Sequence, residues 1–419
     1  MEMSKVSENL AKKLRFLYID NQKTDYTNAS QVSVSNVNRF SFLLSRKGVK
    51  CQDKIISLLK KEFDPGDKIV SDVYLKNLIK ESVRKLSPFE RANVYEHALK
   101  EANNIIDELS TGYKEFNILV PLQNFKTSVD KFNIGKVVFS SINIESYELV
   151  KHLSKNPALQ KSIEKFNHNI VAQITVETKD SKKAEEIALS ELELSLDVIR
   201  FYSMYIHLDS GHLSRNKFGL DGHLFSGNSL MMSYEKKAPG SGNLISARQG
   251  YLYPFDFTKE FQENMYRLNF EILDTILKKN DSDRTKFENR IIQAIRISGS
   301  SFMSYENYDA VLKMIIALES LLLDEREPKI DNLSERTALL IATNYIDRIK
   351  TLYKMKKLYK LRNNIVHQGI TVVDIKHRIQ LQYFTVSCIV LILEKYQTEK
   401  IMNIKDFKKW IYKLKFSNK

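Results

Sequence analysis

The feature that most constrains the fold is a near-continuous series of helical hydrophobic patterns after Thr258. Apolar residues recur there at three- and four-residue spacing, which places them on one face of a helix. Glycine and proline interrupt such patterns, and the 419-residue chain holds only 13 glycines and 7 prolines. Amphipathic helices are predicted over residues 258–279, 283–297, 305–323, 333–353 and 373–396. Short connections between them are typical of antiparallel neighbours in a helical bundle.

The part of the chain before residue 258 combines helical patterns with strand patterns. The first ~110 residues have helical spacing, and Ser87 with Pro88 forms a capping signature for a helix that would run to Leu109. After these residues, Asp180 and Ser181 are predicted to begin another helix. Strands are predicted where β-branched and aromatic residues gather, over 117–121, 132–142, 170–178 and 229–234.

These patterns predict an α+β fold that is predominantly helical. The expected organisation is an N-terminal helical region over residues 1–114, a central mixed α/β domain over 115–257 and a C-terminal helical bundle over 258–419.

The composition indicates the class of partner and the compartment. Lys and Arg number 65 against 51 Asp and Glu, a net charge of +14, which favours polyanions such as nucleic acid. Two cysteines argue against a disulfide framework and against a cysteine-rich zinc site. No signal peptide and no apolar run of the ~20 residues that span a bilayer are visible. We therefore expect a cytoplasmic protein with no membrane partner.

The basic residues are concentrated in two runs. Residues 347–362 contain seven Lys and Arg against one acidic residue, and residues 395–419 contain eight lysines against two acidic residues. Either run could attract phosphate groups, or could simply form a solvated, solubilising surface.

Several functional motifs are absent or weak. No Walker loop or serine nucleophile elbow occurs, which argues against an ATPase and a serine hydrolase. His207, His212 and His223 lie in a glycine-rich stretch and could bind a metal, but a surface loop is the favoured interpretation. No metal site and no cofactor are predicted.

An arginine followed after a short gap by a histidine pairs an anion-binding guanidinium with a titratable imidazole. The pattern occurs three times, as Arg91 with His97, Arg200 with His207, and Arg362 with His367. The first pair falls inside an ordinary predicted helix, and the second closes one. Only Arg362 follows a basic helix and leads, through Asn363, to Gly369 before another helix. We expect this third pair at a junction between helices.

Residues 287–396 resemble the HEPN superfamily, and most closely its ApeA-like branch. The resemblance rests on segments in a set order: 290–296, 316–322 with its Leu-Glu pair at 318–319, 334–340, and the Leu-Arg-Asn-Asn-Ile-Val-His-Gln-Gly motif at 361–369. The helix at 184–201 resembles the region that precedes such domains. Nothing in the first ~110 residues resembles a known family.

The resemblance implies a metal-independent endoribonuclease that cuts single-stranded RNA, with tRNA and mRNA both open as substrates. It also implies a homodimer that forms a composite site, and a role in bacterial anti-phage defence by abortive infection. Residues 1–257 would then sense a trigger or restrain the nuclease. The alternatives are a catalytically inactive HEPN protein that binds RNA or only dimerises, and a substrate for a nucleotidyltransferase.

The resemblance also implies roles for individual residues. Arg362 would hold the phosphate and His367 would transfer a proton. Asn363 would orient the phosphate or the histidine, and Glu319 would support Arg362 or be merely a rim residue. The lysines expected to bind RNA are Lys354, Lys356, Lys357 and Lys360.

Three aromatic side chains have both structural and functional interpretations. Tyr353 and Tyr359 could stack on bases, although a core position is favoured for both. Trp410 could form an RNA shelf, but we expect it to hold the C-terminal helix in place.

Overall fold

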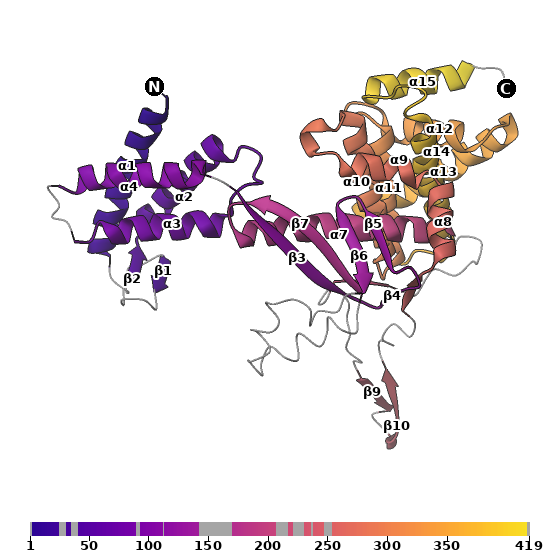
Figure 1. Ribbon diagram of the computed structural model, residues 1–419. Helices are drawn as coiled ribbons and strands as arrows, with labels where there is room; N and C mark the ends of the chain where they lie inside the picture. Colours follow the sequence, from indigo (N-terminus) through magenta and orange to yellow (C-terminus); the bar gives the residue numbers. More distant parts are fainter. Residues whose placement is uncertain are drawn as a thin grey trace. The chain divides into compact units, whose positions relative to one another are not determined.

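The computed structural model describes residues 2–24, 31–34, 41–88, 93–111, 113–141, 170–206, 217–220, 230–235, 238–246 and 254–416. It confirms a predominantly helical α+β fold with a small antiparallel sheet (Figure 1). The chain forms two compact units, each described here by itself. Unit 1 comprises Met1–Ile118 and Thr175–Ser190, and unit 2 comprises Leu119–Ile174 and Glu191–Lys419. The boundaries expected near residues 114 and 257 stay predictions.

Unit 1 is built on four helices and a short antiparallel hairpin. Its main elements are α1 (Glu2–Lys23), β1 (Gln31–Val34), β2 (Ser41–Leu44), α2 (Arg46–Phe63), α3 (Asp72–Lys85) and α4 (Val94–Ser110). Helix α1 packs against α2, α3 and α4, and their apolar faces form one core that includes Leu14, Leu59 and Ala102. Burial of such leucines contributes roughly 2 kcal/mol each.

The capping signature at Ser87 does not begin a helix. Helix α4 begins at Val94, and the Ser87 N–H instead donates to the Arg84 carbonyl at 3.0 Å, in the turn that ends α3. The prediction of a helix start at Pro88 was therefore wrong, because this turn satisfies a carbonyl of the preceding helix.

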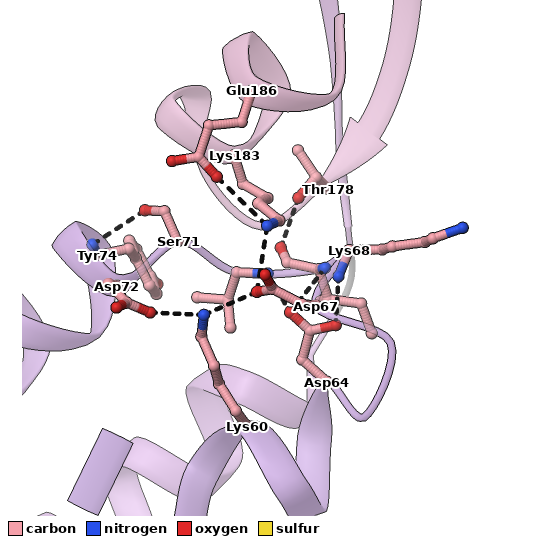
Figure 2. A network of polar contacts seen from close by, with 12 residues as sticks. Lys60, Asp64, Asp67, Lys68, Ser71, Asp72, Tyr74, Thr178, Lys183 and Glu186 are labelled. Carbon is pink, nitrogen blue, oxygen red and sulfur yellow. Dashed lines mark hydrogen bonds and ion pairs between the residues drawn. The ribbon is translucent and has the colours of Figure 1, made fainter. Parts of the chain in front are cut away.

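Carboxylates organise the loop between α2 and α3 in unit 1 (Figure 2). Asp64 accepts hydrogen bonds from the backbone N–H groups of Lys68, Ile69 and Val70 at 2.6–2.9 Å. Nearby, Asp67 pairs with Lys60 at 2.7 Å and with Lys183 at 3.2 Å. These three backbone donors of the loop are thus satisfied, and the loop is held to the first turn of α7 (Ser181–Ile206).

Asp180 confirms its predicted capping role. Its carboxylate accepts from the Lys183 N–H at 3.0 Å and from Ser71 through both the N–H and the hydroxyl. One side chain therefore caps α7 and also anchors Ser71, the N-cap of α3.

A five-stranded antiparallel sheet confirms the strands predicted over 117–121 and 170–178. The single strand predicted over 132–142 was wrong in part, because the chain turns at Gly135 (φ 59°) and forms a hairpin of two strands. Its order is β5 (Lys131–Ile134), β6 (Val137–Ser141), β7 (Ile170–Thr178), β3 (Lys114–Gln123) and β8 (Gly219–Leu220). The predicted strand near residue 230 is β9 (Leu230–Glu235), which pairs with β10 (Ala238–Ser246). A short parallel pair, β4 (Phe125–Thr127) with β11 (Phe255–Phe257), lies in unit 2.

The C-terminal helices of unit 2 pack as a bundle. They are α8 (Lys259–Arg267), α9 (Phe270–Lys278), α10 (Lys286–Phe302), α11 (Asn307–Leu322), α12 (Lys329–Ile341), α13 (Tyr345–Gln368), α14 (Ile375–Lys395) and α15 (Ile404–Phe416), with a 3₁₀ turn at Asp281–Asp283. Helix α11 contacts α10, α12, α13 and α14, and its buried face includes Met314, Leu318 and Leu321. Helix α11 is therefore the central helix among these four neighbours.

Two of the predicted helices are broken in the structure. The pattern over 258–279 divides at Asn269, which adopts a left-handed conformation (φ 64°) that asparagine tolerates better than most residues. The pattern over 333–353 divides between Ile341 and Tyr345, because Asn344 caps α13 by accepting the Asp347 N–H at 2.9 Å. The apolar spacing continues across both breaks, so it does not reveal them.

Candidate functional site

The Arg-Asn-Asn-Ile-Val-His motif lies in the last turns of α13, not at a junction between helices as expected. No glycine or proline interrupts the chain before Gly369, so the helix continues through the motif. Gly369 then adopts a left-handed conformation (φ 69°), and its N–H donates to the Ile365 carbonyl at 3.2 Å. Only His367 approaches the end of the helix.

Arg362 is half-buried and has no acidic partner among the described residues. Its Nη1 donates to the Asn363 side-chain oxygen at 3.2 Å, and its guanidinium carbon lies 5.8 Å from the centre of the Tyr359 ring. Its Nε is buried without a hydrogen-bond partner in the same part of the chain. A permanently charged group with donors left over is suited to receive an anion such as a phosphate.

Glu319 does not pair with Arg362. It accepts a hydrogen bond from the Tyr359 hydroxyl at 2.8 Å and pairs with Lys329 at 3.1 Å. Burial and this hydrogen bond raise the pKa of Tyr359 to about 12, so the phenol stays protonated and continues to donate. Glu319 therefore holds Tyr359, whose ring faces Arg362, and any support that it gives the arginine is indirect.

His367 is exposed and makes no hydrogen bond to the described residues. It lies five positions after Arg362, which corresponds to about 140° around the helix and about 7.5 Å along it. The two side chains of one copy therefore leave α13 on different sides. His367 instead shares a stripe with Lys360, seven positions earlier, where about two full turns bring side chains into line.

The four lysines expected to bind RNA differ in their surroundings. Lys354, Lys357 and Lys360 are exposed, and no described carboxylate pairs with them. Lys356 is half-buried and its ammonium group lies 2.6 Å from a carboxylate oxygen of Asp331. Three lysines are therefore available to a phosphate, whereas the fourth already has a counter-ion.

The aromatic residues divide between core and surface. Tyr359 is buried, and Trp410 is also buried and packs on Phe407, which confirms the structural interpretation of both. Tyr353 is 62% exposed on α13, which also exposes Tyr345 and Ile346, so the core position expected for Tyr353 was wrong. The solvent face of α13 thus combines aromatic, apolar and basic side chains.

A pocket that sequence analysis missed lies beside this face. It has a volume of about 570 Å³, and its lining includes Lys350 and Lys354 of α13 together with Lys376 and Tyr383 of α14. Asp347 is the one acidic residue of its lining, and hydrogen bonds from Asn344 and Lys350 lower the pKa of that carboxyl. Only the packing of α14 beside α13 brings Lys376 to the other two lysines, so no local pattern could reveal the pocket.

The competing arginine of the second pair is structural. Arg200 is only 1% exposed, and its Nη1 donates to Glu193 at 2.6 Å and to Asp197 at 2.8 Å. Its Nη2 donates to the Phe218 carbonyl at 3.0 Å. Arg91, His207, His212 and His223 lie outside the described residues.

No group of three or more His, Cys, Asp or Glu side chains in the described part of the chain is placed to hold a metal ion. Within the same residues, no helix combines the length and the apolar character needed to cross a bilayer. Comparisons with protein-family models, with curated proteins and with solved structures find no significant match for this chain.

Proposed function

We propose that this protein is a metal-independent endoribonuclease of the HEPN type, acting on single-stranded RNA in the cytoplasm. The observation that carries the proposal is Arg362, a half-buried arginine that is held by Asn363 and Tyr359 and has no described acidic partner. The exposed His367 and three unpaired lysines lie on the same helix. This set provides a phosphate-binding charge, a proton-transfer group and a basic approach surface.

The reaction is an RNA transesterification. The 2′-oxygen of a ribose forms a bond to the adjacent phosphorus while the bond from phosphorus to the 5′-oxygen of the next nucleotide breaks. A base accepts the 2′-hydroxyl proton, and an acid supplies a proton to the leaving 5′-oxygen. The products are a 2′,3′-cyclic phosphate and a 5′-hydroxyl. Arg362 stabilises the charge on the pentacoordinate transition state.

A homodimer is the assembly that this chemistry favours. The two proton transfers occur on opposite sides of the phosphorus, and one chain provides one His367 that lies about 140° around the helix from Arg362. A two-fold contact would bring a second His367 and a second Arg362 to the same phosphate. The exposed Tyr345, Ile346 and Tyr353 on α13 provide apolar surface for such a contact.

The same surface supports a second candidate function, in which the bundle binds RNA or dimerises without catalysis. In this case the lysines and aromatic residues would hold a strand or a second copy, and His367 would have no chemical role.

The cellular setting that we propose for the nuclease is anti-phage defence by abortive infection. Residues 1–257 would sense a trigger or restrain cleavage.

The first prediction tests the reaction itself. Purified protein should cleave single-stranded RNA in EDTA and leave 2′,3′-cyclic phosphate and 5′-hydroxyl ends, because Arg362 and His367 supply the charge and the proton transfer. The end groups can be identified by mass spectrometry of a defined oligonucleotide. Cleavage that EDTA abolishes and Mg²⁺ restores would reject the mechanism. Binding without cleavage would favour the inactive module.

A second prediction concerns the four lysines of α13 that are expected to bind RNA. Replacing Lys354, Lys357 and Lys360 together with glutamine should weaken RNA binding and lower the slope of log K against log salt concentration by about 2, since each lost phosphate contact contributes about 0.7. Lys356→Gln is the matched control, because its ammonium group is already paired with Asp331. If Lys356→Gln weakens RNA binding as much as a glutamine substitution at any one of the three exposed lysines does, the ion pair with Asp331 does not keep Lys356 away from the RNA.

A further inference from the structure

A second basic cavity lies in unit 1, between α1 and α2. It has a volume of about 410 Å³, and we call it the lysine groove. Its lining is Asn9, Lys12, Lys13, Phe16, Lys47, Lys50, Cys51 and Lys54. On each helix the lining residues are spaced i, i+3, i+4 and i+7, which places them on a single face. Two helix faces that meet in this way form a trough.

The residues that line the lysine groove carry positive charge only. Its lining contains five lysines and no acidic residue, and none of the five forms a salt bridge with the described part of the chain. The carboxylate of Asp20 acts electrostatically on Cys51 and offsets part of this charge, while its oxygens accept from the Ser45 hydroxyl at 2.6 Å and the Ser45 N–H at 2.9 Å. Five ammonium groups repel one another unless an anion neutralises them.

Hydrogen bonds to one carboxylate tie the two helices of the groove together. Ser45 is the N-cap of α2 and is anchored by Asp20 of α1. Gly48, one turn further along α2, faces the same carboxylate, since a Cβ at this position would lie 2.1 Å from an Asp20 oxygen. A side chain at residue 48 would displace the Asp20 carboxylate, so glycine preserves the hydrogen bonds that tie the first turn of α2 to α1.

The shape and chemistry of the groove fit a nucleic-acid strand. From i to i+7 each lining face extends about 10 Å, a length over which one strand with the spacing of B-form DNA presents about three phosphates. Phe16 is 42% exposed and lines the groove beside Lys12 and Lys13. Proteins that bind single strands place basic residues on the backbone and stack unpaired bases on exposed aromatic rings. The bases of a duplex are already stacked on one another, so this combination favours a single strand.

We propose that the lysine groove binds a single-stranded nucleic acid, with its lysines on the phosphates and Phe16 stacked on a base. The proposal does not rest on the nuclease function, because the groove belongs to unit 1 whereas Arg362 and His367 belong to unit 2. It assigns unit 1 a nucleic-acid contact of its own. The strand bound there need not be the strand that is cut.

The test uses a fluorescein-labelled oligodeoxythymidylate of about 15 nucleotides, a length within the usual site sizes of single-strand binders. DNA lacks the 2′-hydroxyl, so the proposed transesterification cannot cut this probe. The test variant of the full chain combines Lys12→Gln, Lys50→Gln and Lys54→Gln. Its matched control combines Lys61→Gln, Lys76→Gln and Lys100→Gln, three exposed lysines of unit 1 outside the groove.

The expected result by fluorescence anisotropy is at least a tenfold loss of affinity in the test variant and a change below twofold in the control. Phe16→Ala should weaken binding about tenfold, because one stacked base contributes about 1–3 kcal/mol. Thermal unfolding by circular dichroism checks that each variant is folded. Equal affinity of the wild type and the test variant would overturn the proposal.

A second readout locates the probe, because the oligonucleotide could also bind the lysines of α13. Cys51 lines the groove and is half-buried, whereas Cys388 is fully buried and should not react in the folded protein. The oligonucleotide should slow alkylation of Cys51 by iodoacetamide in a saturable way. Unchanged alkylation at saturating probe would overturn the proposal.

Two competitors distinguish the strand from other anions. Tripolyphosphate and polyglutamate are each added at the same concentration of negative charge as the oligonucleotide. The proposal predicts that both protect Cys51 less well than the oligonucleotide does. Equal protection by tripolyphosphate, with no effect of Phe16→Ala, would assign the groove to a small polyphosphate instead. Equal protection by polyglutamate would assign it to an acidic protein segment.

Discussion

Arg362→Ala and His367→Ala are each expected to reduce RNA cleavage about a thousandfold, the contribution typical of a positioned proton-transfer or charge-stabilising group. The loss should appear in kcat, because the lysines of α13 still hold the RNA. Matched controls are Arg326→Ala and His377→Ala, which remove an exposed arginine and an exposed histidine elsewhere in the bundle. Initial rates on a fluorogenic RNA measure the effect. A loss below tenfold for His367→Ala would remove the histidine from the mechanism.

Mixing the two inactive variants tests whether the site is shared between copies. The shared site of a mixed dimer keeps one Arg362 and one His367, so it should recover part of the activity, whereas the site of either variant alone lacks one of the two groups altogether and should stay inactive. Activity of the wild type should also fall when the protein is diluted below the dissociation constant of the dimer. A stable monomer in light scattering that cleaves at full specific activity would contradict the composite site.

Gly299→Ala should destabilise the protein by about 3 kcal/mol, the upper end of the usual cost of overpacking. Gly299 is buried on α10, and a Cβ at this position would lie 2.3 Å from the carbonyl oxygen of Asp197 on α7 and 2.6 Å from its Cα. Backbone atoms cannot rotate away as a flexible side chain can. The higher helix propensity of alanine, worth about 1 kcal/mol, is too small to offset the collision.

Chemical denaturation of the full chain measures this change in the free energy of unfolding. Gly66→Ala is the control, because Gly66 lies in an exposed turn and the nearest atom to its new Cβ would be 4.0 Å away, on the side chain of Lys68. We expect a change within about 0.5 kcal/mol for this variant. Equal stability of Gly299→Ala and Gly66→Ala would show that α7 and α10 can separate there at no cost.

Local signals in the sequence predicted much of the fold. The alternating strand at 170–178 and the Asp180 cap after it are confirmed, because a two-residue period and a capping carboxylate act within a few residues. The break before Asn344 was missed, although Asn followed three residues later by Asp is itself a capping pattern. Continuous apolar spacing concealed it.

The candidate site could be predicted only in part. The residue types at 362–367 are visible in the sequence, but the direction in which each side chain leaves α13 depends on the helix continuing to Gly369. The role of Tyr359 as the partner of Glu319 depends on α11 lying against α13. The pocket at Lys376 and the lysine groove each need two helices side by side, and neither helix alone carries a signal for them.

The divergence of Arg362 and His367 on α13 has a consequence for a cell that makes this protein. If one copy cannot aim both groups at one phosphate, the number of working sites follows the number of pairs. At low abundance the number of pairs rises with the square of the chain concentration, so halving expression removes about three quarters of the sites. On the proposed function as a nuclease of abortive infection, a cell with few copies carries little cleavage activity, and a modest rise in abundance is enough to switch it on.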